Sequence, residues 1–147
     1  MNFTKYTPFN TVGMIERDRI AQFLFEHLDE YGDKKEDIMR CVDYALENGS
    51  HPGGLILLAE EEDKIVGATI VNRTGMTGYI PDNILVYIAI HKDQRGKGVG
   101  KQLMQQAMDS TTGDIALHVE SNNPAKHLYE KLGFSNKYLE MRWKRNG

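Results

Sequence analysis

The sequence is poor in cysteine and has no long apolar run. A single cysteine, Cys41, stands in 147 residues, which excludes an internal disulfide and a metal cluster held by several thiolates. No apolar stretch approaches the ~20 residues that a membrane-spanning helix needs. No basic N-terminal segment leads into an apolar run of the kind that marks a signal peptide. We therefore expect a cytoplasmic protein without a membrane partner.

Charge of one sign is not in large excess either. The chain has 18 Lys and Arg against 21 Asp and Glu, a formal net charge of −3, so electrostatics gives no reason to expect a nucleic-acid partner. The histidines show no metal-type spacing, and no metal is expected. Hydrophobic residues make up 40% of the chain, which suits one globular domain over residues 1–147.

Apolar periodicity predicts a mixed succession of strands and helices. Strands are expected where β-branched and aromatic residues cluster or alternate, and helices where apolar residues recur three or four positions apart. This order predicts an α/β sheet with helices on its faces. The expected strands are 3–6, 55–60, 65–73, 84–90, 115–119 and 138–144, and the expected helices are 15–31, 34–47, 99–108 and 124–132.

Two further features have a structural and a functional interpretation. Cys41 lies on the apolar stripe of the helix 34–47, which favours a buried thiol over a nucleophile. The connection 74–82 is long for a hairpin, and it is either a functional loop or a simple excursion of the chain.

The strongest signal follows the apolar strand 84–90, in Gln94-Arg95-Gly96-Lys97-Gly98-Val99-Gly100. The first amides of a helix have no partner within it, and the helix dipole places positive charge there. Glycines let a phosphate approach the backbone closely, and Arg95, Lys97 and Lys101 add charge. The turn predicts a diphosphate ligand; the alternative is a tight turn that binds nothing.

The glycine spacing excludes two common nucleotide motifs. The order G-x-G-x-G is neither the dinucleotide fingerprint G-x-G-x-x-G nor a P-loop. What remains, Arg95-x-x-Gly98-x-Gly100, resembles the R-x-x-G-x-G/A motif of the GNAT superfamily of acetyl-CoA-dependent N-acetyltransferases. A second stretch, 123–134, resembles the signature N-x-A-x-x-L-Y-E-K-x-G-F of the same family. Asn123 is a natural N-cap for its helix, and Gly133 is a natural helix stop.

The resemblance implies a fold and a cofactor site. The fold is a three-layer α/β (α+β) arrangement with a mixed, mostly antiparallel sheet, helices on both faces, and central strands 84–90 and 115–119 that splay apart. The pantetheine arm of acetyl-CoA would pair with the first of these strands, and the pyrophosphate would bind the turn amides. The implied cofactor-binding residues are Ile88, Ala89, Ile90, Arg95, Gly96, Lys97, Gly98, Val99, Gly100, Lys101, Asn123, Lys126 and Tyr129.

The resemblance also implies direct attack of a primary amine on the thioester, in a ternary complex. A strand amide near Ile88 would stabilise the oxyanion, and Tyr129 would protonate the leaving thiolate. The structural interpretation of Tyr129 is core packing with the hydroxyl at the rim. A base must also take a proton from the acceptor ammonium.

The strand 84–90 carries no acid to serve as that base. Glu120 and His118, near the end of the neighbouring strand, are the first candidates, and the ordinary pKa of histidine suits proton transfer. Asp82 and Tyr87 are further candidates. An ordinary polar role on a strand is the alternative for His118.

The acceptor class stays open at this point. Small amines, polyamines, amino acids, aminoglycosides and protein N-termini are all compatible, and the donor is either acetyl-CoA or a longer acyl-CoA. Members of the family often form homodimers. Two alternatives come from other classes: a non-catalytic coenzyme A-binding sensor or interaction module, and a nucleotide-binding regulatory protein that uses the same turn.

Overall fold

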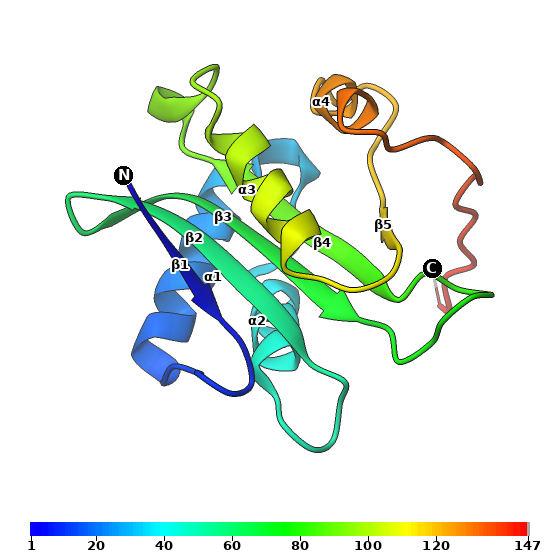
Figure 1. Cartoon of the computed structure of the whole chain (residues 1–147), viewed down its shortest axis with the longest axis horizontal. Coiled ribbons are helices and arrows are strands. Elements are labelled where there is room, and N and C mark those ends of the chain that lie inside the picture. The colour runs from blue at the N-terminus through cyan, green and yellow to red at the C-terminus, as the bar shows by residue number, and fades with distance from the viewer. Residues whose placement is uncertain (147) are drawn as a thin grey trace. The chain divides into compact units, whose positions relative to one another are not determined.

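The computed structural model describes residues 1–146, and the chain divides into two compact units, Met1–Leu117 and a second unit that begins at His118. The first unit contains a sheet with the strand order β1-β2-β3-β4-β5 (Figure 1). Its strands are β1 Asn2–Tyr6, β2 Gly54–Glu61, β3 Lys64–Arg73, β4 Asn83–Ile90 and β5 Ile115–Leu117. Its helices are α1 Met14–His27, α2 Lys35–Leu46 and α3 Val99–Asp109, with short 3-10 helices η1 Asp29–Tyr31 and η2 Lys92–Gln94.

The sheet is mixed. Strands β1 to β4 pair antiparallel, whereas β5 runs parallel to β4. The parallel pairing joins Asn83 to Ile115 and ends where Leu85 faces Leu117, although β4 continues to Ile90. The parallel pairing therefore covers only the first part of β4, because β5 ends at Leu117.

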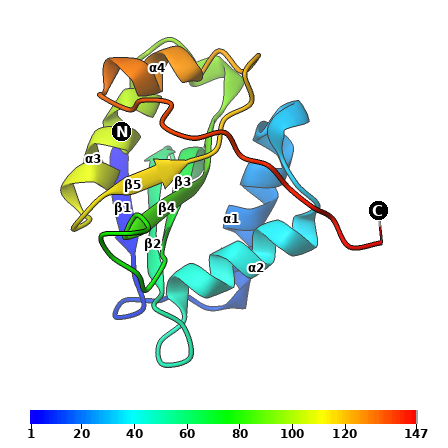
Figure 2. The same cartoon turned by 90° about the vertical axis from the view of Figure 1, so that its right-hand side faces the viewer.

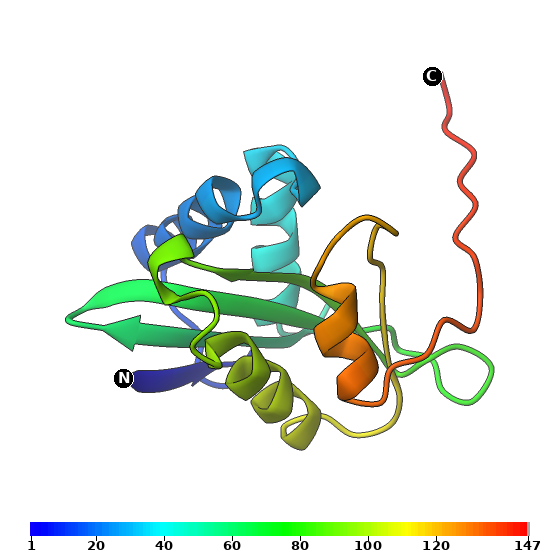
Figure 3. The same cartoon turned by 90° about the horizontal axis from the view of Figure 1, so that it is seen from above.

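Helices cover both faces of this sheet, which confirms the expected fold class (Figures 2 and 3). The helices α1 and α2 lie on one face, where apolar side chains of both helices and of β2, β3 and β4 form one buried cluster. On the other face α3 buries Val99 and Leu103. A Cβ added to Gly67 of β3 would lie 3.0 Å from a Leu103 methyl group, so this glycine lets α3 approach the sheet closely.

Two expected boundaries move inward. The helix 15–31 ends at His27, and a separate 3-10 turn follows, because Asp29 adopts a left-handed backbone with φ of 56° that an α-helix does not accommodate. The strand 115–119 ends at Leu117, so His118 lies outside the sheet.

The second unit contains the helix α4, Lys126–Lys131. The Oδ1 atom of Asn123 accepts a hydrogen bond from the Ala125 amide at 3.0 Å, which closes the turn that leads into α4, whereas the N-cap of α4 itself is Ala125. At the other end Gly133 has φ of 101°, and the Phe134 amide donates to the Tyr129 carbonyl at 3.0 Å. This is the left-handed stop that the sequence predicts, although the regular helix is shorter than 124–132.

The predicted strand 138–144 is wrong, because those residues form no strand in the part of the chain that the structure describes. Leu139, Met141 and Trp143 alternate with charged residues, yet they are 82%, 91% and 75% exposed. Alternation gives a segment one apolar face, but a strand forms only when a neighbour accepts its backbone hydrogen bonds.

Among residues 1–146, no helix has both the length and the apolar character needed to cross a bilayer.

Candidate functional site

Within residues 1–146, β4 pairs with β5 only as far as Leu85, although β4 continues to Ile90. His91 donates its amide to the Val66 carbonyl at 2.8 Å, and Ile90 faces Gly67 in the same register. In an antiparallel ladder alternate residues turn their backbone groups to the same side. Ala89 therefore turns its groups toward β3, whereas Ile88 and Ile90 turn theirs toward the side that β5 leaves.

A β-bulge lies where the two strands separate. Ile70 of β3 faces Tyr87, and Val71 faces Leu85, so Val86 is the extra residue on β4. Bulges bend a strand locally and are common beside active sites. The amides from Ile88 onward thus follow the bulge, on a part of β4 that lies beyond the pairing with β5.

The glycine turn leads from this open strand into α3. Gly96 and Gly98 have φ of 78° and 85°, and a Cβ on either would meet nothing within 4 Å. The backbone conformation, not crowding, therefore requires these two glycines. Gly98 is the N-cap of α3, and the first helical bond runs from the Gln102 amide to the Gly98 carbonyl at 3.0 Å. The amides 99–101 are then directed out of the helix end.

The Arg95 side chain turns away from these amides. Its Nε atom donates to the Ile90 carbonyl at 3.0 Å. Its Nη2 atom donates to the His27 carbonyl at 3.3 Å and to Asp29 Oδ2 at 3.1 Å. Arg95 therefore ties the turn to the end of β4 and to the end of α1. Positive charge beside the helix amides comes instead from Lys97 and Lys101, which are exposed.

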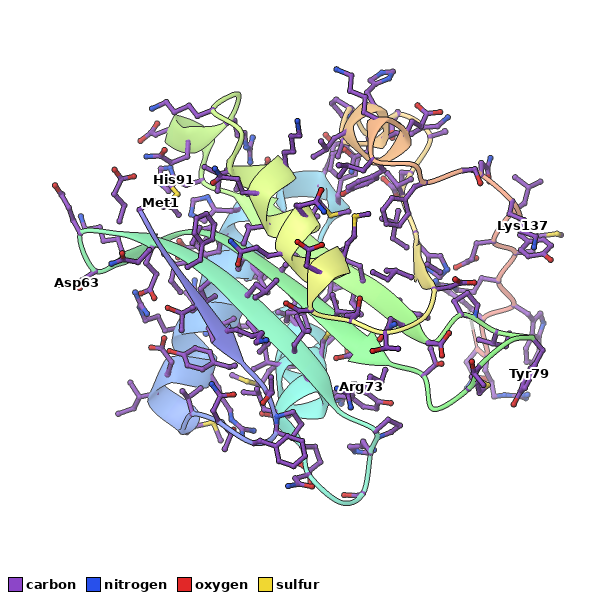
Figure 4. The ribbon with its side chains drawn as sticks, viewed as in Figure 1. Met1, Asp63, Arg73, Tyr79, His91 and Lys137 are labelled. Atoms are coloured by element: carbon purple, nitrogen blue, oxygen red, sulfur yellow. The ribbon has the colours of Figure 1, made fainter. Side chains whose placement is uncertain are left out.

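Two histidines lie beside this anchor. The rings of His27 and His91 are 4.7 Å apart, and His91 Nδ1 accepts a hydrogen bond from the Asp93 amide at 3.1 Å. Burial, followed by the charges of His91 and Arg95, lowers the pKa of His27 below its ordinary value of 6.5. His27 is therefore uncharged near neutral pH. Figure 4 shows His91 at this end of the sheet and Arg73 at the opposite end.

On the face of the sheet covered by α1 and α2, Tyr87 contacts a carboxylate from a distant segment. Its hydroxyl donates to Asp33 Oδ2 at 2.5 Å, and Asp33 lies between η1 and α2. Burial, followed by the hydrogen bond and charge of Asp33, raises the pKa of Tyr87 far above its usual range. Tyr87 keeps its proton under all ordinary conditions, so it acts as a donor and not as the base that the sequence suggested.

A part-buried polar pair lies on the same face of the sheet. Asn72 Nδ2 donates to Cys41 Sγ at 3.4 Å, and burial raises the pKa of the Cys41 thiol to about 12. Cys41 is buried and protonated, which confirms a core thiol. Within residues 1–146 the buried Oδ1 atom of Asn72 has no hydrogen-bond partner.

Asp82 lies at the far end of β4 from the turn. It accepts a hydrogen bond from the Asp114 amide at 3.2 Å, and a Cβ on Gly113 would fall 2.3 Å from its carboxyl carbon. A hydrogen bond from Thr77 and the Asp114 amide lower its pKa. Asp82 joins the loop 74–82 to the residue before β5, at the end of β4 opposite to the glycine turn.

The remaining candidates belong to the second unit. Tyr129 is 7% exposed, its ring centroid lies 6.2 Å from that of Phe134, and burial raises its pKa. Lys126 begins α4 and is half-buried, whereas His118 and Glu120 are exposed in the segment before it. Across residues 1–146 no three His, Cys, Asp or Glu side chains are grouped to hold a metal ion.

A family model identifies the family of this chain. The family model described as acetyltransferase (GNAT) domain matches residues 52–136, which is more than half of the chain. The chain is 30% identical over 84 residues to a 5-NmdU N-acetyltransferase of Pseudomonas phage PaMx11, covering 56% of this chain and 58% of that protein. It is 30% identical over 82 residues to N-alpha-acetyltransferase 30 of Schizosaccharomyces pombe, covering 52% and 55%.

The chain thus spans little more than half the length of these curated relatives. Among solved structures it is similar to a GNAT-family acetyltransferase of Streptococcus pneumoniae, with a TM-score of 0.70 and 17% identity over 99% of this chain and 98% of the other. At that identity the likeness shows the fold.

Proposed function

Because this chain belongs to the GNAT family of acetyltransferases, we propose that it transfers the acetyl group of acetyl-CoA to a primary amine. The observation that carries the proposal is the geometry after Leu85. The edge of β4 opens at the Val86 bulge, and the same strand runs directly into a glycine turn that presents the first amides of α3. The edge of β4 can pair with an extended arm that carries amide groups, and the first amides of α3 can bind a diphosphate.

Coenzyme A supplies both parts. We assign the pyrophosphate to the amides 99–101, where the helix dipole and exposed Lys97 and Lys101 favour negative charge. We assign the pantetheine arm to the backbone groups of Ile88 and Ile90, because an extended chain can pair with an open strand edge. Arg95 acts as a positioning residue for the turn. Asn123, Lys126 and Tyr129 are assigned to the cofactor by their motif.

The transfer needs no covalent enzyme intermediate. The amine nitrogen attacks the thioester carbon, the C–N bond forms, and the C–S bond breaks. The Ile88 amide donates to the developing oxyanion. Tyr129 gives its proton to the leaving thiolate, because a phenol is protonated at neutral pH, and it regains a proton from solvent. Glu120 and His118 are our candidates to pass the acceptor's proton to solvent, with which both are in contact.

The test is a screen of primary amines that follows free thiol released from acetyl-CoA. Aliphatic amines, diamines, aminoglycosides and peptides with free N-termini belong in the panel, because the two curated relatives are named for different acceptors. Amine-dependent thiol release supports the proposal. Binding of acetyl-CoA without release for any amine would favour a coenzyme A sensor instead.

A further inference from the structure

The contact between Tyr87 and Asp33 brings a carboxylate to β4, a strand that has no acid of its own between Ile84 and Ile90. The two residues are 54 positions apart in the sequence. Tyr87 follows the Val86 bulge and precedes Ile88, whose backbone groups turn toward the open edge. The carboxylate is therefore anchored on the same short piece of strand that we assign to the thioester.

The hydrogen-bond chemistry around this contact has a definite direction. The phenolic proton of Tyr87 is given to Asp33, so the lone pairs of the phenol and the second Asp33 oxygen can only accept. Asp33 is exposed, and an exposed carboxylate that can only accept favours a ligand that donates hydrogen bonds and carries positive charge.

Asp33 is placed to meet a nitrogen other than the reacting one. The whole length of the Tyr87 side chain separates the carboxylate from the backbone of β4, whereas an oxyanion held by the Ile88 amide must lie within hydrogen-bond distance of that backbone. A carboxylate in contact with the reacting nitrogen would also stabilise its protonated form, and an ammonium has no lone pair with which to attack.

We infer that Asp33, held by Tyr87, binds a second positively charged group of the acceptor. The inference rests on the proposed function and narrows it. The acceptor is a primary amine that carries a further cationic group several bonds away, as in a diamine. Asp33 determines specificity in this assignment, and Tyr87 positions it.

The test compares diaminobutane with butylamine, which has the same carbon chain but a single charge. An ion pair to an exposed carboxylate contributes about 0.2–1 kcal/mol, equivalent to a preference of up to roughly fivefold. We expect the wild-type protein to prefer diaminobutane by that factor in kcat/KM. Asp33→Asn keeps an oxygen for the Tyr87 hydroxyl, and it should abolish the preference by raising KM for diaminobutane alone. Tyr87→Phe should reduce the preference in the same direction.

Glu36→Gln is the matched control, since it removes one negative charge from the first turn of α2, close to Asp33 in the sequence, and should leave the preference unchanged. Equal loss for both amines in Asp33→Asn, or no preference in the wild-type protein, would overturn the inference. So would an equal effect of Glu36→Gln, because the effect would then be one of summed charge.

A binding titration separates this inference from the proposed function. Backbone amide NMR shifts are followed while diaminobutane is added to the coenzyme A-saturated protein. Saturable shifts around Asp33 and Tyr87 that are lost in Asp33→Asn support the cation site even where no amine is acetylated. If the protein acetylates butylamine but diaminobutane does not bind at Asp33, the proposed acetyltransferase function is supported and the cation site is refuted.

Discussion

Replacing Gly98 by aspartate and by asparagine, and comparing the affinity of the two variants for acetyl-CoA, tests whether the diphosphate binds at the N-terminus of α3. Gly98 caps α3 with φ of 85°, and a Cβ there would meet nothing within 4 Å. Each substitution therefore destabilises the fold only through the left-handed backbone, by about 1 kcal/mol, because Asp and Asn adopt this conformation more readily than other non-glycine residues. In the aspartate variant, the negative charge at the start of α3 stabilises the helix by about 0.3–1 kcal/mol. Both variants should fold.

The two variants differ in charge and not in size. A carboxylate about 4 Å from a phosphate charge is repelled by about 1 kcal/mol in water, and the turn is exposed, so the aqueous value applies. Two phosphate charges give about 2 kcal/mol, or roughly a thirtyfold loss of affinity. The asparagine variant carries the added volume without the repulsion, so the ratio between the two isolates the electrostatic part.

Isothermal titration with acetyl-CoA gives the two dissociation constants. We expect Gly98→Asp to bind roughly thirtyfold more weakly than Gly98→Asn, and the ratio to fall at high salt because exposed charges are screened. Circular dichroism establishes that each variant is folded. Equal affinity in the two folded variants would refute the assignment of the diphosphate to the N-terminus of α3.

Three further outcomes are expected. Tyr129→Phe should lower kcat about a hundredfold near neutral pH with little change in KM, and the defect should shrink in alkaline buffer as the thiolate needs less protonation; full kcat with chemistry rate-limiting would make Tyr129 a packing residue. Arg95→Met should weaken acetyl-CoA binding by loosening the turn from Ile90 and Asp29, and unchanged affinity would show that the turn is rigid without this anchor. The pKa of His27 is lowered in the fold, so as the pH is lowered through about 6.5 the unfolded chain binds more protons than the folded chain, and the free energy of unfolding should decrease. His27→Gln should make the free energy of unfolding from urea denaturation depend less on pH in this range. An unaltered pH dependence would assign it to another group.

The strand, turn and helix to which we assign the cofactor can be predicted from sequence because their signals are local. An apolar run, glycines at fixed spacing and a periodic segment predict β4, the turn and α3 within a residue or two. The positive φ of Gly96 and Gly98 follows from the same glycines. These elements can be predicted because the pattern of their own residues determines where each one begins and ends.

The contacts that complete the site lie beyond such patterns. Asp33 meets Tyr87 across 54 positions and Arg95 meets Asp29 across 66, and no spacing along the chain marks either pair. For the same reason the sequence suggested Tyr87 as a base, although its contact with Asp33 makes it a donor. The segment 138–144 shows the reverse case, because its alternation predicts a strand that does not form within residues 1–146.

The most direct test of the account follows both products of a single reaction. The protein is mixed with acetyl-CoA and the amine that releases most thiol in the screen, and free thiol is measured beside the acetylated amine by mass spectrometry. We predict one acetylated amine for each thiol released, and no release beyond the uncatalysed rate when the amine is omitted. Tight binding of acetyl-CoA together with thiol release that yields no acetylated amine would contradict the central claim.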